Sequence, residues 1–263
     1  MSFLRKILET KKEEVSILRK CFSINSFKES EYFSMPSISL KKALCRGDRL
    51  GIISEIKKAS PSKGILKEKF DHLAIAKEYI DNETDAISIL TDKNYFNGDI
   101  KYLNNIAAIK TIPLLRKDFI IDEFQILEAK ANGADAILLI AEALSKTQIT
   151  ELTAAAKECG LEVLLEIHSS AQLEKINFEK NDLIGINNRN LETFEVNLNT
   201  TSELAAIIPG NVTLVSESGL NTIDDLNRIK SSRAKAVLVG EHFMRSGNIG
   251  ESFKEFKRWC LLK

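Results

Sequence analysis

Eight short apolar segments recur along this 263-residue chain, and most of them end in a charged or amide side chain. The clearest of these ends carry Glu55 and Lys57, Lys117, Glu166, Asn187 and Glu217. A buried strand gains nothing from a charge at its end, because removing an unpaired ion from water is costly. When many parallel strands each end in one, the simplest explanation is a single polar pocket that all of them face.

The apolar segments are near-continuous runs of Ile, Leu, Val and Ala, as expected of strands buried on both faces. They predict strands at Gly51–Ile56, Ala86–Leu90, Ile112–Leu115, Ala136–Ile140, Glu162–Leu165, Leu183–Ile186, Val212–Val215 and Ala236–Val239. The intervening patterns predict helices at Leu73–Ile80, Ile100–Lys110, Glu123–Ala131, Thr147–Cys159, Ala171–Ile176, Ser202–Ile208, Thr222–Lys230 and Glu251–Leu262. Thr200 or Thr201 and Asn221 are the expected N-caps of two of these helices.

Successive strands start roughly 20–35 residues apart, which leaves room for one helix and two short loops in each repeat. Eight such repeats favour one α/β domain over residues 1–263, a closed (β/α)8 or TIM barrel with its functional residues at the carboxyl ends of the strands. An open doubly wound sheet is the rival fold. No Gly-x-Gly-x-x-Gly motif follows the first strand, so the barrel is preferred.

Residues 1–48 precede the first strand and predict a helical extension. Apolar side chains recur at helical spacing in its first half, at Phe3, Leu4, Ile7, Leu8, Val15 and Leu18. A second, shorter helix is expected at Ser39–Leu44. We interpret the extension as a cap over one mouth of the barrel rather than as a separate binding module. A contact with another subunit is the open alternative, and the expected state is a monomer.

The charge balance argues against nucleic-acid and membrane partners, because 37 Lys and Arg residues cancel 37 Asp and Glu residues. The longest apolar run, Ala136–Ala141, is far shorter than the ~20 residues that span a bilayer. The first residues are too polar for a signal peptide. The four cysteines lie far apart, which favours reduced thiols and a cytoplasmic location. No His-x-His, His-Glu-x-x-His or dense Asp cluster is present, so no metal site is expected.

Several strand ends carry groups suited to acid–base chemistry. Glu55 and Lys57 lie two positions apart and therefore on one face of the first strand; an ion pair at the barrel rim is the alternative. Lys117 can donate a proton, form a Schiff base or bind a carboxylate, and burial is expected to lower its pKa. Glu166 suits a general base or cation stabiliser. His168 shares its face and is expected to be a hydrogen-bonded histidine of the rim, with a second titrating group as the alternative.

The loops after the seventh and eighth strands predict a phosphate site. Barrel enzymes often bind phosphate there, together with the N-terminus of a short extra helix. In this chain the loops contain Ser218 and Gly219 in one and Gly240 and Glu241 in the other, so backbone N–H groups can approach an anion. Arg189, two residues beyond Asn187, suits a carboxylate through its bidentate guanidinium.

Four segments resemble the signatures of the indole-3-glycerol-phosphate synthase family of tryptophan biosynthesis: residues 53–64, 114–119, 184–191 and 215–219. The resemblance covers all eight strands and the helical extension. It implies a carboxy-lyase that converts 1-(2-carboxyphenylamino)-1-deoxyribulose 5-phosphate, a small phosphosugar, into indole-3-glycerol phosphate with loss of carbon dioxide and water. No cofactor and no metal are implied.

The resemblance also implies a role for each motif residue. Lys117 matches the general acid, Glu166 a catalytic carboxylate, and Lys57, beside Glu55, the lysine that contacts the substrate carboxylate. Asn187 and Glu217 match polar residues around the sugar chain. The remaining matches are a residue near the substrate carboxylate (Arg189), phosphate-site positions (Ser60, Ser218, Gly219 and Gly240) and apolar positions around the aromatic ring (Phe96, Phe119, Leu138 and Leu191).

This chain departs from the family pattern at a few positions. Glu241 stands where some relatives have a small hydroxyl residue beside the phosphate, so a backbone contact is expected there. Asn190 and Asn197 replace an expected Asp. The alternatives to the synthase are another phosphosugar barrel, such as a phosphoribosylanthranilate isomerase or a Schiff-base aldolase using Lys117, and an inactive scaffold.

Overall fold

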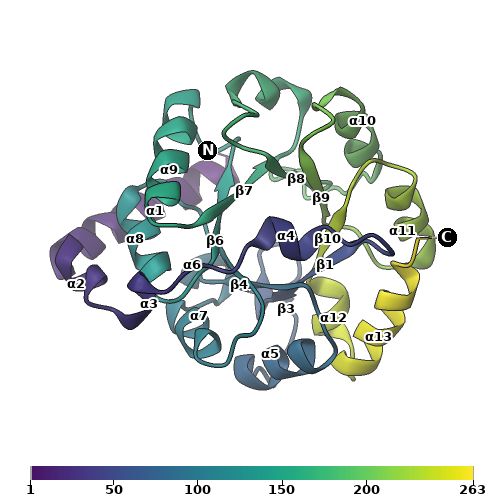
Figure 1. Cartoon of the computed structure of the whole chain (residues 1–263), viewed down its shortest axis with the longest axis horizontal. Coiled ribbons are helices and arrows are strands. Elements are labelled where there is room, and N and C mark those ends of the chain that lie inside the picture. The colour runs from purple at the N-terminus through teal and green to yellow at the C-terminus, as the bar shows by residue number, and fades with distance from the viewer. Residues whose placement is uncertain (1, 263) are drawn as a thin grey trace.

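Eight parallel strands close into a barrel in the computed structural model, which describes residues 2–262 (Figure 1). The strands are β1 (Gly51–Ile56), β4 (Ala86–Leu90), β5 (Leu114–Lys117), β6 (Ala136–Ile140), β7 (Glu162–Ile167), β8 (Leu183–Asn187), β9 (Thr213–Glu217) and β10 (Ala236–Val239). Pairing of β1 with both β4 and β10 closes the sheet. The predicted (β/α)8 barrel is therefore confirmed, and the open sheet is excluded.

Strand β5 begins and ends two residues later than predicted. Its ladder starts at Leu114, since Pro113 has no N–H and contributes only its carbonyl, which accepts from Ile87 N at 3.1 Å. As a result Lys117 belongs to the strand itself, paired with Leu90. Its side-chain direction is then set by the ladder and not by a loop.

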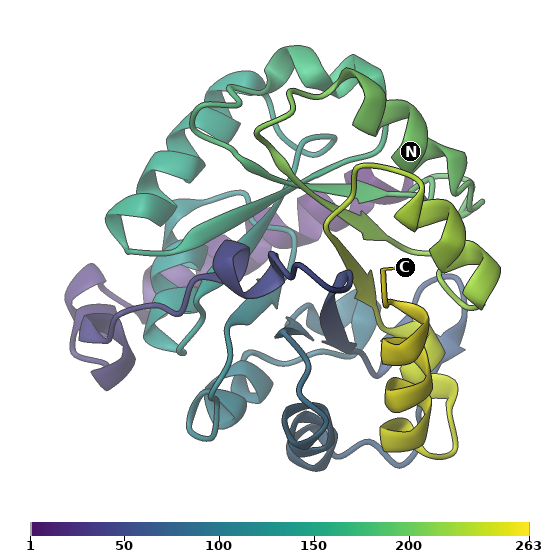
Figure 2. The same ribbon diagram turned by 45° about the vertical axis from the view of Figure 1, so that its right-hand side comes forward.

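Helices surround the barrel, as Figure 2 shows. They are α5 (His72–Asp81), α7 (Ile100–Ala107), α8 (Glu123–Ala131), α9 (Lys146–Glu158), α10 (Asn199–Ile207), α11 (Ile223–Lys230) and α13 (Ile249–Trp259), with short α6 (Lys93–Phe96) and α12 (Glu241–Arg245). The helix predicted after β7 is a 3-10 helix, η1 (Ser170–Lys175). A small hairpin, β2 (Ala59–Ser60) and β3 (Gly64–Ile65), occupies the loop predicted after β1.

Both N-cap predictions are wrong. Helix α10 begins earlier than expected, and Thr201 lies inside it, fully buried, with its hydroxyl 2.8 Å from Asn188 Oδ1. Helix α11 is capped by Thr222, whose hydroxyl accepts from Asp225 N at 3.2 Å while the Asp225 side chain accepts from the Thr222 N–H. This reciprocal capping box satisfies two helix-end donors, which Asn221 alone cannot do.

Two apolar layers support the barrel. Inside it, Ile53, Leu115 and Leu164 are fully buried beneath the strand ends. Outside it, large side chains such as Tyr79, Phe243 and Phe253 fill the space between strands and helices. The inner layer forms a floor under the carboxyl ends of the strands, so polar side chains there can face only the mouth of the barrel.

The N-terminal extension contacts both ends of the barrel, whereas the sequence predicted a cap over one mouth only. It contains α1 (Phe3–Cys21), α2 (Ile24–Lys28), α3 (Glu31–Ser34) and α4 (Leu40–Leu44). Figure 1 shows α4 in front of the barrel, where Ser39 Oγ donates to Glu162 at the amino end of β7. Helix α1 lies behind the barrel in that view, and its first turns reach the carboxyl-end mouth. The connecting segment therefore wraps around one side of the barrel.

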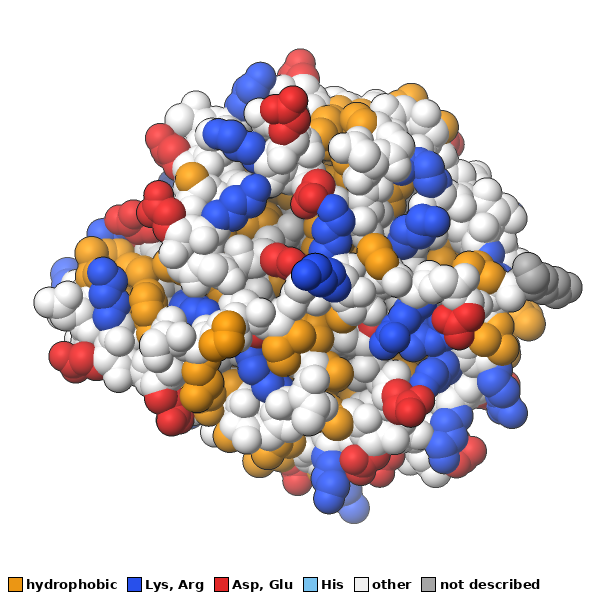
Figure 3. Space-filling model, in the orientation of Figure 1, with side chains coloured by type: hydrophobic (Ala, Val, Ile, Leu, Met, Phe, Trp, Pro, Cys, Tyr) orange, Lys and Arg blue, Asp and Glu red, His pale blue; other side chains and the backbone are white. Residues whose placement is uncertain are grey.

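Positive and negative side chains are interspersed over the face drawn in Figure 3, in keeping with the balanced composition. Cys21, Cys45, Cys159 and Cys260 are free thiols, as predicted, although the first two are exposed. Across residues 2–262, none of the helices combines the length and apolar character needed to cross a membrane.

Candidate active site

A cavity of about 150 Å³ opens at the carboxyl ends of the strands. All the predicted site residues line it except Glu217, whose carboxylate lies just beneath, against Lys117. The structure therefore brings together residues that are up to 186 positions apart, from Glu55 to Glu241. Their chemical roles remain predictions.

Lys117 lies at the centre of the polar cluster. Its Nζ is 2.5 Å from Glu217 Oε2, 3.6 Å from Glu166 Oε2 and 3.8 Å from Glu55 Oε1. Burial alone lowers the pKa of this ammonium, but the three carboxylates outweigh burial and raise it well above the ordinary value. The expectation of a lowered Lys117 pKa was therefore wrong. The sequence did not reveal that three carboxylates share one lysine.

The two deepest carboxylates have opposite ionisation behaviour. Burial and the neighbouring Glu166 charge raise the pKa of Glu217 to about 7, although Lys117 opposes the rise. Burial also disfavours ionisation of Glu166, but Lys117, His168 and the Asn187 amide outweigh it and hold its pKa below the ordinary range. Of these two carboxylates, Glu166 is therefore firmly ionised around neutral pH, whereas Glu217 titrates there.

Glu55 and Lys57 form an ion pair with Oε2 and Nζ 2.5 Å apart, and both side chains face the cavity from β1. Burial raises the pKa of Glu55, but Lys57 and Lys117 more than reverse this and lower it. Gly240, which directly follows the neighbouring strand β10, leaves space for this carboxylate, since a Cβ there would overlap Glu55. Gly240 therefore has a packing role beside its predicted phosphate role.

The loops after β9 and β10, which carry the predicted phosphate positions, line another part of the cavity. Ser218 and Gly219 adopt φ angles of 67° and 80°, the left-handed region in which a residue with a Cβ is strained. The negative charge of Glu241 is partly balanced by two arginines, because its carboxylate lies 3.5 Å from Arg189 and 3.2 Å from Arg245. Arg189 also donates to the Phe194 carbonyl at 3.1 Å.

The opposite wall is apolar and aromatic. Phe96 and Phe119 have ring centroids 6.2 Å apart and line the cavity together with Leu138 and Leu191; binding of an aromatic ring by these four residues stays a prediction. Sequence reasoning missed the contribution of α1, whose Phe3, Leu4 and Ile7 line the same wall. The periodic apolar face of α1 predicted a cap over one mouth of the barrel, but not that its side chains line the cavity itself.

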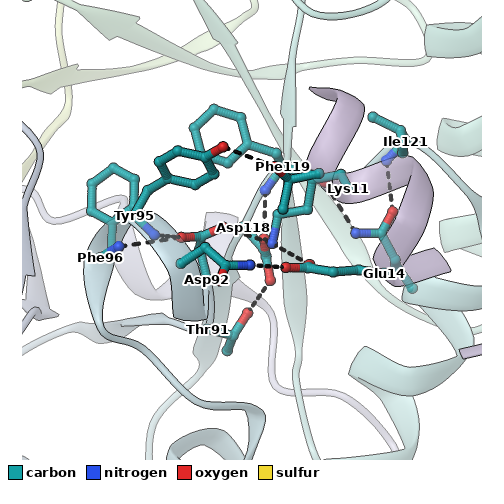
Figure 4. Close-up of polar contacts among 12 residues, drawn as sticks. Lys11, Glu14, Thr91, Asp92, Tyr95, Phe96, Asp118, Phe119 and Ile121 are labelled. Atoms are coloured by element: carbon teal, nitrogen blue, oxygen red, sulfur yellow. Dashed lines mark hydrogen bonds and ion pairs between the residues drawn. The ribbon is translucent and has the colours of Figure 1, made fainter. Parts of the chain in front are cut away.

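A buried ion cluster attaches α1 to this wall (Figure 4). Lys11 is 1 % exposed, and its Nζ lies 2.7 Å from Asp92 Oδ2 and 2.8 Å from Asp118 Oδ1. Asp92 Oδ1 accepts the Tyr95 and Phe96 N–H groups, and Asp118 Oδ1 accepts that of Phe119 at 2.8 Å. One lysine of the extension therefore braces both loops that present the aromatic pair.

Comparison with known proteins matches residues 4–256 to the model of the family described as indole-3-glycerol phosphate synthase. The chain belongs to the indole-3-glycerol phosphate synthase family. A protein of that name from Alkaliphilus metalliredigens is 43 % identical over 254 residues, covering 97 % of each chain. Those from Polynucleobacter asymbioticus and Nautilia profundicola are 45 % and 51 % identical, covering 96 % and 78 % of this chain and 97 % and 80 % of theirs.

Solved structures support the fold of this synthase-family chain. The crystal structure of 3-hexulose-6-phosphate synthase from Salmonella typhimurium superposes with a TM-score of 0.66 at 11 % identity, covering 80 % of this chain and 98 % of the other. KGPDC from Streptococcus mutans gives a TM-score of 0.61 at 12 % identity, covering 81 % and 97 %. At such low identity the likeness concerns the barrel alone.

Proposed function

We propose that this cavity closes the indole ring of 1-(2-carboxyphenylamino)-1-deoxyribulose 5-phosphate and releases carbon dioxide and water. The ring carbon that bears the carboxylate attacks the ketone, whose oxygen takes a proton. Carbon dioxide then leaves, and the resulting hydroxyl departs as water after a second proton transfer. The single observation that carries the proposal is a protonated lysine surrounded by three carboxylates beside an aromatic wall, in a chain of this family.

Lys117 is the proposed general acid for ring closure. The carboxylates around it keep its ammonium form populated, so it offers a proton to the ketone oxygen. The same feature argues against an aldolase that uses Lys117 as a Schiff-base nucleophile, because an amine must be neutral to attack a carbonyl. Borohydride reduction in the presence of substrate is expected to leave Lys117 unmodified.

Glu166 and Glu217 suit the two later steps. Glu166, held ionised, is proposed to stabilise the cationic intermediate and accept a proton from it. Glu217, with a pKa of about 7, exchanges a proton readily near neutral pH and is proposed to assist departure of the hydroxyl, with Asn187 beside the sugar chain. Two carboxylates with divergent pKa values divide the roles of base and acid.

Lys57, oriented by Glu55, and Arg189 are proposed to bind the substrate carboxylate. Leu138, Leu191 and the aromatic pair enclose the substrate ring. The phosphate is placed against Ser60, Ser218, Gly219 and Gly240, where backbone amides and hydroxyls are available. Glu241 contributes its N–H there, while its ion pairs with Arg189 and Arg245 offset its negative charge.

The direct test is to add the carboxyphenylamino substrate and follow indole fluorescence in buffer containing a chelator. Turnover that is lost in Lys117→Ala and Glu166→Gln, with folding intact by circular dichroism, supports the proposal. Lys57→Ala is expected to weaken both binding and rate. Well-folded protein that forms no indole product contradicts the proposed reaction, and a Lys57→Ala variant altered only in thermal stability reduces Lys57 to a rim ion pair.

We also propose that the protein is a cytoplasmic monomer. Reduced cysteines fit the location, and the burial of the apolar face of α1 against its own barrel leaves that face unavailable to a second subunit. Sedimentation velocity at micromolar concentration tests the oligomeric state, and a dimer contradicts it.

A further inference from the structure

His168 occupies a position that the proposed reaction does not use. It follows β7 and lies on the same inward side as Glu166, two residues earlier. Its side chain is 7 % exposed and stands between two carboxylates: Nε2 is 3.3 Å from Glu166 Oε1, and Nδ1 is 3.5 Å from Glu142 Oε2. Apart from these two contacts, the ring nitrogens have no hydrogen-bond partner among residues 2–262.

The 3-10 helix η1 fixes this arrangement from behind. Gln172 accepts the His168 backbone N–H through Oε1 at 2.8 Å, and its Nε2 donates to Glu142 Oε2 at 3.4 Å. One amide side chain therefore holds both the histidine backbone and the outer carboxylate. The position of the imidazole is therefore fixed by tertiary contacts of Gln172 and Glu142.

The distances between the lysines and the carboxylates of the cavity indicate a role for His168. Lys57 is paired with Glu55, and Lys117 lies 2.5 Å from Glu217 but 3.6 Å from Glu166. Glu166 is therefore farther from the central lysine than Glu217 is, yet its pKa is lowered whereas that of Glu217 is raised. The additional group that faces Glu166 is the His168 imidazole, whose Nε2 lies 3.3 Å from Glu166 Oε1.

Three carboxylates act on the imidazole itself. Burial disfavours its charged form, but Glu166, Glu142 and, at longer range, Glu217 outweigh burial and raise the pKa of His168. The other two histidines behave in the opposite way, since burial lowers the pKa of both His72 and His242. His72 and His242 therefore serve as internal references for the pKa of His168.

We propose that His168 is a positioning residue that keeps Glu166 ionised and directed at Lys117, and thereby decides which carboxylate of the cavity acts as the base and which carries the exchangeable proton. Glu142 supports this role from the outside, since its carboxylate lies 3.5 Å from Nδ1 and favours the charged form of the imidazole. The inference rests on the proposed role of Glu166 and assigns no substrate contact to His168.

The first test needs no substrate. With three histidines in the chain, NMR titration of the imidazole signals is readily assigned by comparison with His168→Gln. His168 is expected to titrate above the ordinary value near 6.5, and His72 and His242 below it. Glu166→Gln is expected to lower the His168 pKa strongly. Glu142→Gln is expected to lower it less, because that side chain is 33 % exposed and solvent screens it.

The second test is kinetic. His168→Gln keeps an N–H donor but no charge, and His168→Leu removes both. Loss of a hydrogen bond to a charged group predicts that kcat falls roughly ten- to one-hundred-fold in His168→Leu and less in His168→Gln, with KM changed little. The acidic limb of the kcat profile should move to higher pH, since Glu166 protonates more easily without the imidazolium. His72→Gln, at the start of α5 and outside the cavity lining, is the matched control and should keep wild-type kinetics.

The outcomes separate this inference from the proposed function. Active wild-type protein with unchanged pH profiles in both His168 variants overturns the role of His168 and leaves the reaction intact. A His168 signal that titrates at or below those of His72 and His242 overturns it as well. Absence of indole product from wild-type protein defeats the reaction, whereas the NMR titration still reports on the pairing of His168 with Glu166.

Discussion

Replacing Lys11 with methionine tests how the N-terminal helix is attached to the barrel. Methionine keeps the apolar stem but removes the ammonium from between Asp92 and Asp118, which are 0 % and 3 % exposed. Asp92 Oδ2 has no hydrogen-bond partner other than this ion-pair contact within residues 2–262. Asp118 retains the Thr91 hydroxyl and Arg116 at 3.3 Å. The substitution therefore leaves one buried carboxylate oxygen without any compensation.

The expected cost follows from this geometry. Removing one partner of a buried ion pair destabilises a protein by about 3–5 kcal/mol, because the remaining charge stays desolvated. For a chain of this size, 1 kcal/mol corresponds to roughly 2–4 °C in Tm, so Lys11→Met is expected to lower Tm by roughly 10 °C. The loops that carry Phe96 and Phe119 lose their brace at the same time, so KM should rise more than kcat falls.

Urea unfolding followed by circular dichroism, together with calorimetry, measures the change. Lys12→Met is the matched control: the neighbouring lysine is 64 % exposed, pairs with Glu9 at 2.9 Å, and is expected to change stability by less than about 1 kcal/mol. Adding Asp92→Asn to Lys11→Met should restore part of the loss, since an amide needs no cation. The reasoning is refuted if Lys11→Met costs no more than Lys12→Met, or if Asp92→Asn makes the double variant worse.

Three further predictions follow from buried groups near the mouth. Gly185→Ala should reduce kcat by more than about tenfold, because its Cβ would overlap Glu217 Oε1 and displace the carboxylate from Lys117; steady-state kinetics checks this, and wild-type turnover contradicts it. Lys117→Met should raise the Glu217 pKa above about 7, since Lys117 lowers it, as carbon-13 NMR of labelled glutamate can measure; an unchanged or lower value counts against the assigned contact. Asp118 has a pKa of about 2, since the charge of Lys11 outweighs the effect of burial. Because this value is below the unfolded pKa near 3.8, the ionised carboxylate stabilises the fold above pH 3.8, and this stabilisation is lost as the pH falls through about 2. Unfolding curves should show an acid loss of roughly 2 kcal/mol between about pH 4 and 2, smaller in Lys11→Met, and equal losses in the two proteins would contradict it.

The barrel itself could be predicted because its signal is local and repeated. Runs such as Ala136–Ile140 and Leu183–Ile186 are apolar without alternation, which is typical of strands covered on both faces. Eight such strands separated by helices close most simply into a barrel. The ends of the helices were harder to predict from the sequence. At Thr201 a side chain typical of an N-cap is recruited into a buried network with Asn188 and Ser216 instead.

The candidate site was located from sequence because parallel strands bring their carboxyl ends together whatever the loops do. That argument placed Lys117 and Glu166 in one cavity but could not rank their distances. The ionisation of Lys117 depends on three carboxylates within 4 Å, and Coulomb interactions in a buried site change steeply over that range. The expected lowering of its pKa failed for this reason.

The amino-acid sequence alone determined the fold, the family signatures and the set of residues at the barrel mouth, since periodicity and strand-end chemistry are written in consecutive positions. Only the tertiary structure decided that α1 forms a wall of the cavity, that Lys11 braces the aromatic pair, and that His168 faces Glu166. These features depend on contacts between segments far apart in the chain. Charge and desolvation act through distance in space, which sequence separation does not encode.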